Sequence, residues 1–293
     1  MSAADPWRVR LGSALYEVRP SWCRLPDGGS PAAVSQVAVD SAGRIYALLR
    51  ADPPVMVFDA GGAYLHSIGA GRVLDSHGIC IDAQDRVWVV DRDAHQLLVF
   101  DTGGRELFRL GQRGCPEFGA PFNHPTDVAV APDGEIYVSD GYGNACVHRF
   151  TPEGALIGSW GAPGGGPGEF STPHAVWVHG EDRVLVADRE NDRVQVFDRA
   201  GGLVAIWPDV YRPMDIAGTA EGILVTDQVP RVSLFSIEGR LLGRGRPVLN
   251  GAHGIWCAPN GDIYCAEMIP SRITRLQRLH RDEVAFPLKS GPP

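Results

Sequence analysis

The stretch ICIDAQDRVWVVDRDAHQLLVFDTGGRELFRLG, residues 79–111, decides the fold, because its pattern recurs along most of the 293-residue chain. Each unit contains four short runs of β-branched and apolar residues, the second of which ends in Asp. The runs are separated by a turn rich in Asp and Gly, a polar turn and a Gly turn, in that order. Similar units begin at residues 37, 128, 176, 215 and 255. Four-stranded repeats of about 40 to 50 residues are typical of propeller blades. The sequence therefore predicts an all-β, six-bladed β-propeller.

The period-two alternation within each unit predicts a small antiparallel sheet with two differently solvated faces. Radial stacking of such sheets buries these faces, and closing the ring leaves only short edges. The last unit is short of an outer strand, and we predict that the segment beginning at Leu15 supplies it. Gly/Pro-rich loops from Gly111 and Gly161 are expected to connect blades and to cover one mouth of the channel. Residues 1–293 are predicted to form a single domain.

Composition argues against two classes of partner. The net charge is −8 and Lys289 is the only lysine, so the chain lacks the basic patches that nucleic acids and anionic membranes require. No apolar run is long enough for a membrane helix, and the N-terminus lacks the apolar core of a signal peptide. We predict a cytoplasmic protein whose six scattered cysteines are reduced, with one or two disulfides in an exported form as the alternative. The sequence does not indicate an oligomeric state.

One position of the repeat carries candidate chemistry. Aligning the blades on their second strands places one residue just ahead of each innermost strand, in the order Ser35, His77, Thr126, His174, Met214 and His253. Every second blade of a six-bladed ring is related by about a third of a turn, so the three histidines are predicted to converge on the axis. Three His nitrogens with an open position are the usual composition of a catalytic Zn²⁺ site. The alternative is three channel-lining histidines bonded to the backbone.

Two other sets of polar residues recur without pointing to the axis. The remaining histidines do not share the register and are interpreted as surface or supporting residues, with His95 and His124 near the mouth; they are His66, His95, His124, His148, His179 and His280. An Asp ends the second strand in four blades and is interpreted as a turn-holding hydrogen-bond acceptor; these are Asp91, Asp140, Asp188 and Asp227.

Several stretches resemble the peptidyl-α-hydroxyglycine α-amidating lyases, six-bladed NHL-repeat propellers with a zinc ion on three histidines. The resembling stretches are SHGICIDAQDRVWVVDRDAHQ from Ser76, HPTDVAVAPDGEIYVSDGYGN from His124, GEFSTPHAVWV from Gly168, VLVADRENDRVQVF from Val184 and, more loosely, AHGIWCAPNGDIYCAE from Ala252. The resemblance covers roughly residues 35–275 and implies the same three zinc ligands as the register: His77, His174 and His253.

The resemblance also implies residues that act on a small-molecule substrate. The family's catalytic tyrosine falls on Tyr142, and its active-site arginines fall on Arg189 and, in a poorly matching segment, Arg50. The arginines would bind a substrate carboxylate. Met214 would line the substrate pocket, although core packing explains a methionine there equally well. Tyr142 as a loop aromatic and Arg189 as a structural ion-pair partner remain alternatives.

Two departures from the family bear on cofactors. Gly254 stands where the family has an Asp that helps to hold calcium, which argues against a Ca²⁺ ion, and Gly143 replaces a family cysteine. The implied function is a zinc-dependent lyase that cleaves the C–N bond of a carbinolamide. A metal-dependent propeller hydrolase or lactonase, and a non-catalytic NHL interaction module, remain the alternatives.

Overall fold

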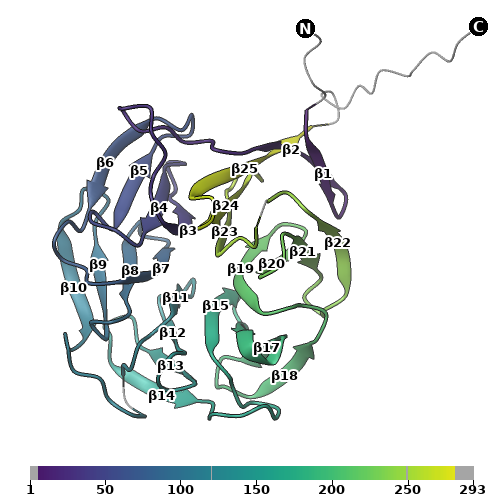
Figure 1. The fold of residues 1–293 in the computed structure, drawn as a ribbon. Helices are drawn as coiled ribbons and strands as arrows, with labels where there is room; N and C mark the ends of the chain where they lie inside the picture. Colours follow the sequence, from purple (N-terminus) through teal and green to yellow (C-terminus); the bar gives the residue numbers. More distant parts are fainter. Residues whose placement is uncertain (1–5, 120, 249, 281–293) are drawn as a thin grey trace, which may run out of the picture.

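The structure, a computed structural model, describes residues 6–119, 121–248 and 250–280. These residues form six antiparallel sheets arranged around a central axis, and each sheet turns one edge strand towards that axis (Figure 1). The predicted all-β, six-bladed propeller is confirmed. No helix in the described part of the chain is long and apolar enough to span a membrane.

Blades 1 to 5 are four-stranded sheets whose strands follow one another outward from the axis. Blades 1 to 3 contain β3 (Val34–Val39), β4 (Ile45–Leu49), β5 (Val55–Phe58), β6 (Tyr64–Ile68); β7 (Ser76–Ile81), β8 (Val87–Asp91), β9 (Gln96–Phe100), β10 (Glu106–Gly111); and β11 (Asp127–Val130), β12 (Ile136–Asp140), β13 (Cys146–Phe150), β14 (Leu156–Trp160). Blades 4 and 5 contain β15 (Pro173–His179), β16 (Arg183–Asp188), the 3₁₀ turn η1 (Arg189–Asn191), β17 (Arg193–Asp198), β18 (Leu203–Trp207); and β19 (Pro213–Thr219), β20 (Gly222–Asp227), β21 (Val232–Phe235), β22 (Leu241–Gly245).

Blade 6 joins the two ends of the described chain. It contains β23 (Gly254–Cys257), β24 (Ile263–Glu267), β25 (Arg272–Leu279), β2 (Ala14–Arg19) and β1 (Arg8–Leu11). Strand β2 pairs antiparallel with β25, with Leu15 opposite Leu279. The predicted closure of the ring by the segment from Leu15 is therefore confirmed.

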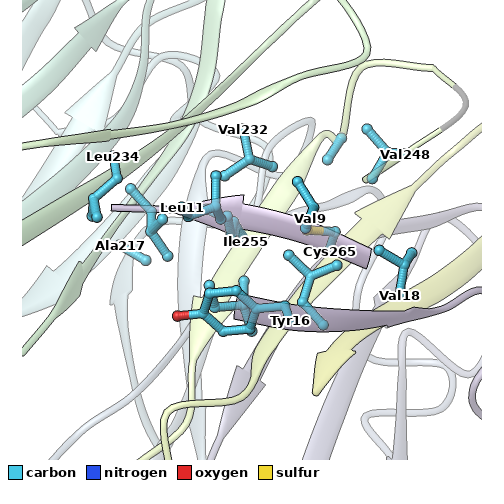
Figure 2. Close-up of a cluster of buried hydrophobic side chains, with 14 of the residues drawn as sticks. Val9, Leu11, Tyr16, Val18, Ala217, Val232, Leu234, Val248, Ile255 and Cys265 are labelled. Atoms are coloured by element: carbon cyan, nitrogen blue, oxygen red, sulfur yellow. The ribbon is translucent and has the colours of Figure 1, made fainter. Parts of the chain in front are cut away.

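Strand β1 is a fifth strand of blade 6 that the repeat did not predict. It pairs with β2 and buries Val9 and Leu11 in a cluster that includes Val232 and Leu234 of blade 5 (Figure 2). Burial of apolar surface stabilises the folded state by roughly 25 cal/mol per Å². The contact of β1 with blade 5 therefore helps to hold the ring closed, although β1 is not part of the repeat.

Buried apolar side chains fill the spaces between neighbouring blades. The three inner strands of blade 2 are almost wholly buried, whereas its outer strand β10 alternates between partly buried and exposed positions. Chain direction alternates from strand to strand, so all innermost strands begin at one face of the ring, which the loops between consecutive blades also cross. We call this the connection face.

Candidate metal centre

Three histidines meet on the axis at the connection face. His77 is the second residue of β7, His174 is the second residue of β15, and His253 directly precedes β23. Their ring centroids lie 4.9 Å (His77 to His174), 5.4 Å (His77 to His253) and 4.9 Å (His174 to His253) apart. One nitrogen of each lies within 4.8 Å of the other two, close enough for the three to share a metal ion.

The blades between the histidines hold the imidazoles in place. Each Nδ1 contacts the backbone carbonyl at the equivalent position of the next blade, and the pairs are His77 to Thr126 at 2.7 Å, His174 to Met214 at 2.7 Å and His253 to Ser35 at 2.9 Å. A carbonyl oxygen only accepts, so each Nδ1 donates its proton, and in a neutral imidazole each Nε2 keeps a lone pair. Backbone anchoring of this kind is usual for metal-binding histidines.

The surroundings favour the neutral imidazoles that metal binding requires. Burial lowers the pKa of His77 and His174 well below its usual range, and neighbouring imidazole charges add to the effect. Burial, with the charge of Arg50, lowers the pKa of His253 to about 3. The Nε2 of His174 is buried and has no hydrogen-bond partner among the described residues, as expected of an atom that binds a ligand instead. The donor set therefore fits a divalent transition metal.

Tyr142 lies against this cluster, in the turn between β12 and β13. Its hydroxyl is 3.1 Å from the Nε2 of His77 and accepts a hydrogen bond from Nη1 of Arg189 at 3.2 Å. The His77 Nε2 carries the lone pair, so the tyrosine hydroxyl donates to it. The side chain is 38% exposed, which leaves Tyr142 accessible from the connection face.

The two predicted arginines lie on either side of the mouth. Arg189 begins η1, where its Nε donates to Glu190 at 2.9 Å. Arg50 follows β4, and its Nη1 lies 3.7 Å from a carboxylate oxygen of Asp75. Burial lowers the pKa of Arg50, and its buried Nε has no hydrogen-bond partner within the part of the chain that the structure describes. Arg50 is thus a poorly neutralised cation beside the histidines.

Met214 is buried and lines the small cavity that contains the three histidines. Its carbonyl fixes His174, a role that the side chain gave no reason to expect. Its contact with a substrate stays a prediction.

Arg92 is a residue at the mouth that the sequence reasoning missed. Its guanidinium carbon lies 5.4 Å from the centre of the Tyr142 ring, the same separation as that of Arg189. The repeat contained a signal, because Arg92 follows Asp91 as Arg189 follows Asp188.

A polar layer closes the channel beneath the histidines. It consists of the residues one step along the innermost strands of blades 1, 3 and 5, which are Gln36, Asp127 and Asp215. The Nε2 of Gln36 donates to Asp215 at 3.1 Å, and backbone N–H groups of neighbouring blades bind both carboxylates. Burial raises the pKa of Asp127 well above its usual range and that of Asp215 to about 7.

This layer separates the histidines from a cavity of about 250 Å³ on the opposite side, whose walls include Trp177 and Trp256. We infer that a ligand reaches the histidines from the connection face.

The recurring aspartates hold the loops of that face. Their carboxylates accept backbone N–H groups from the loop entering each blade, as Asp91 does from Leu74, Asp140 from Asn123 and Asp188 from Ser171. The buried Asp140 also accepts from His148, so this second group of potential metal ligands, which includes Cys146, is engaged in a structural network. All six cysteines are free thiols.

Comparison with known proteins shows which sequences this chain is similar to. The NHL repeat model matches residues 77–100 and 122–150, in blades 2 and 3. Peptidylglycine alpha-amidating monooxygenase of Rattus norvegicus is 46% identical over 88 residues, which are 27% of this chain and 9% of the rat protein. A Caenorhabditis elegans protein, named as a "Probable peptidyl-alpha-hydroxyglycine alpha-amidating lyase", is 30% identical over 200 residues. The chain is an NHL-repeat propeller related to the α-amidating lyases.

The relationship is partial in extent. The nematode match covers 59% of this chain and 55% of the nematode protein, so the chain spans about half of that relative and little of the rat enzyme. Among solved structures, the gluconolactonase XC5397 from Xanthomonas campestris aligns with a TM-score of 0.69 at 15% identity, covering 94% of this chain and 96% of that chain. That likeness shows the propeller fold alone.

Proposed function

We propose that the protein is a zinc-dependent lyase that cleaves R–CO–NH–CH(OH)–R′ to an amide and an aldehyde such as glyoxylate. The observation that carries this proposal is a set of three neutral imidazoles converging on one point, with the hydroxyl of Tyr142 bonded to both His77 and Arg189. The relationship to the amidating lyases supports this chemistry over other reactions of a three-histidine site.

His77, His174 and His253 would hold the metal through Nε2. When bound there, Zn²⁺ would supply a Lewis acid that lowers the pKa of the substrate hydroxyl.

Tyr142 moves the proton in this proposal. The hydroxyl oxygen of the substrate loses a proton, its electrons form the aldehyde C=O bond, the C–N bond breaks, and the nitrogen takes up one proton. One group can therefore accept the proton and return it, and the reaction needs neither water nor a redox partner. Tyr142 suits this role because its hydroxyl lies beside the Nε2 of His77 and accepts a hydrogen bond from Arg189. A metal on that Nε2 would take the lone pair to which the hydroxyl otherwise donates, which would free the hydroxyl to exchange protons with the substrate.

Arg50 and Arg189 bind the substrate carboxylate. A guanidinium presents paired N–H donors that match a carboxylate. The spare Nε of Arg50 and the long contact to Asp75 leave this cation available, whereas Arg189 is also engaged with Glu190 and Tyr142. We therefore assign the larger share of carboxylate binding to Arg50.

The direct test uses protein purified without a histidine tag. Metal analysis should find about one zinc per chain, as a single three-histidine site requires. Incubation with α-hydroxyhippurate should release benzamide and glyoxylate in equal amounts. Turnover of lactones or esters without glyoxylate release would instead indicate a hydrolase, and the absence of both metal and turnover would favour a non-catalytic interaction module.

A further inference from the structure

The turn between β8 and β9 reaches from blade 2 to Tyr142 in blade 3. It runs from Arg92 to His95 and is closed by a hydrogen bond from the backbone N–H of His95 to the carbonyl of Arg92 at 3.2 Å. The two ends of the turn hold Tyr142 in different ways. Arg92 contacts the ring of Tyr142, and His95 acts on its backbone through a neighbouring loop.

Arg92 contacts the ring. Its guanidinium carbon lies 5.4 Å from the centre of the Tyr142 ring, within the range of a cation–π interaction. Two carboxylates fix the guanidinium, because Nε donates to Asp93 at 2.8 Å and Nη2 contacts Asp75. Since Asp75 also faces Arg50, these contacts join the Tyr142 ring to the arginine that we assign to the substrate carboxylate.

His95 acts through the neighbouring loop. Its Nδ1 accepts the backbone N–H of His124 at 3.1 Å, and the carbonyl of His124 accepts the backbone N–H of Tyr142 at 3.3 Å. The two imidazoles also pack edge to face, with ring centroids 4.3 Å apart. His95 therefore holds His124, whose carbonyl in turn holds the backbone of Tyr142.

The loop that contains Asn123 and His124 is also fixed to the end of strand β12. The backbone N–H of Asn123 donates to Asp140 at 2.9 Å, and Nδ1 of His124 contacts the side-chain oxygen of Asn123 at 2.8 Å. The loop cannot shift at His124 without disturbing the strand end that carries Tyr142.

We propose that Arg92 and His95 are positioning residues that keep the hydroxyl of Tyr142 between His77 and Arg189. The inference rests on the proposed function, in which that hydroxyl moves the proton. A displacement of about 1 Å at a reacting group is enough to lower a rate on the order of 100-fold.

The test compares disruptive and conservative substitutions. Arg92→Gln removes the cation, whereas Arg92→Lys keeps a positive charge near the ring. His95→Phe removes the acceptor but keeps a ring, whereas His95→Asn offers an oxygen near the position of Nδ1 and suits the positive φ of 56° at this residue. We expect kcat with α-hydroxyhippurate to fall about 10- to 100-fold in Arg92→Gln and His95→Phe, with KM and zinc content little changed, and to recover in part in Arg92→Lys and His95→Asn.

Matched controls lie in blades 1 and 2, away from Tyr142. Arg86 binds Asp82 and lies over the Trp88 ring at 5.3 Å, but at the opposite face, and His66 contacts the carbonyl of Thr102 on the outside of the ring. Arg86→Gln and His66→Phe should leave kcat unchanged.

A second readout separates positioning from general damage. In a Tyr142→Phe background, Arg92→Gln and His95→Phe should cause no further loss, because the group that they position is gone. Equal losses with and without Tyr142, or a raised KM at constant kcat, would overturn the positioning role. If Tyr142→Phe is inactive while both turn variants are fully active, only this inference fails; if the wild-type protein releases no glyoxylate, the proposed function itself fails.

Discussion

The six blades share one backbone plan but form two sets of three at the axis. Blades 2, 4 and 6 contribute imidazoles, from His77, His174 and His253. Blades 1, 3 and 5 contribute the backbone carbonyls that fix those imidazoles and then a polar layer of Gln36, Asp127 and Asp215. The difference places a threefold site on a sixfold scaffold, because equivalent positions carry different side chains in alternate blades.

Burial shifts the pKa values of the two sets in opposite directions. Burial lowers the pKa of the histidines and raises that of the aspartates, so it favours the neutral form in both sets. The neutral imidazoles are ready to bind a metal ion, whereas the aspartates are fully occupied by backbone N–H groups and Gln36.

Replacing one imidazole should break this division with the largest effect. His174→Ala removes one of three ligands, so we expect zinc to be lost and activity to fall by roughly 10³-fold or more, the scale of several kcal/mol of lost charge stabilisation. Zinc analysis and glyoxylate release measure this change.

The matched control is in the other set of blades. Met214→Leu keeps the carbonyl that anchors His174 and should therefore retain zinc at one per chain. If His174→Ala is folded and still binds zinc, the shared metal site is wrong; if it unfolds, His174→Gln repeats the test with a side chain closer in size.

Replacing a titratable carboxyl group of the polar layer with an amide should change how stability depends on pH. The folded state raises the pKa of Asp215 from 3.8 to about 7, so the stability that this group contributes is fully present below pH 3.8 and is lost as pH rises through 7. The loss has an upper bound of roughly 4 kcal/mol. We expect metal-free Asp215→Asn to lose less unfolding free energy than the wild type between pH 5 and pH 8, as measured by urea denaturation. An identical slope in both proteins would show that Asp215 is charged in the folded state.

Much of this arrangement could be predicted from the repeat itself. The period of the strand pattern predicted the blades, and the register of His77, His174 and His253 predicted which side chains meet at the axis. These features repeat, so one alignment of the chain with itself reveals them. The need of blade 6 for another strand likewise predicted the role of the segment from Leu15.

Features that do not repeat could not be predicted in this way. Strand β1 has no counterpart in other blades, and the contact of Arg92 with Tyr142 depends on how two neighbouring blades are oriented. Gln36 and Asp127 occupy the same position of the repeat in different blades. Because one is an amide and the other a carboxylate, the sequence alone did not predict the hydrogen bond between them. Sequence periodicity thus specifies what each blade has in common, while contacts between unlike side chains require coordinates.

A small residue follows each of the three histidines, between the histidine cluster and the polar layer. Enlarging this residue should disturb both layers with a smaller effect on stability. A Cβ atom on Gly78 would lie 2.8 Å from the carbonyl oxygen of Thr126 and 2.9 Å from the Cα of Asp127, which are backbone atoms that cannot easily move. Gly78→Ala should lower the free energy of unfolding by about 1–3 kcal/mol. Ala175 already fills the equivalent position in blade 4, so Ala175→Gly should cost less than about 1 kcal/mol. Equal losses in urea denaturation would mean that blades 2 and 4 have the same space at this position.

The smallest expected effect is the loss of stability that the metal-binding histidines cause as the pH falls. Because the folded state lowers the pKa of His253 from 6.5 to about 3, the stability that this group contributes is present above pH 6.5 and is lost as pH falls towards 3. At pH 6 the loss is about 1 kcal/mol relative to pH 8. His253→Asn keeps an N–H donor for the carbonyl of Ser35 but cannot take up a proton, so the metal-free variant should lose about 1 kcal/mol less than the wild type between pH 8 and pH 6. Since Asp215 changes stability in the opposite direction over this range, the comparison must be made between variant and wild type at each pH. A variant that follows the wild type would show that His253 accepts a proton in the folded state, and the neutral three-imidazole site would then be wrong.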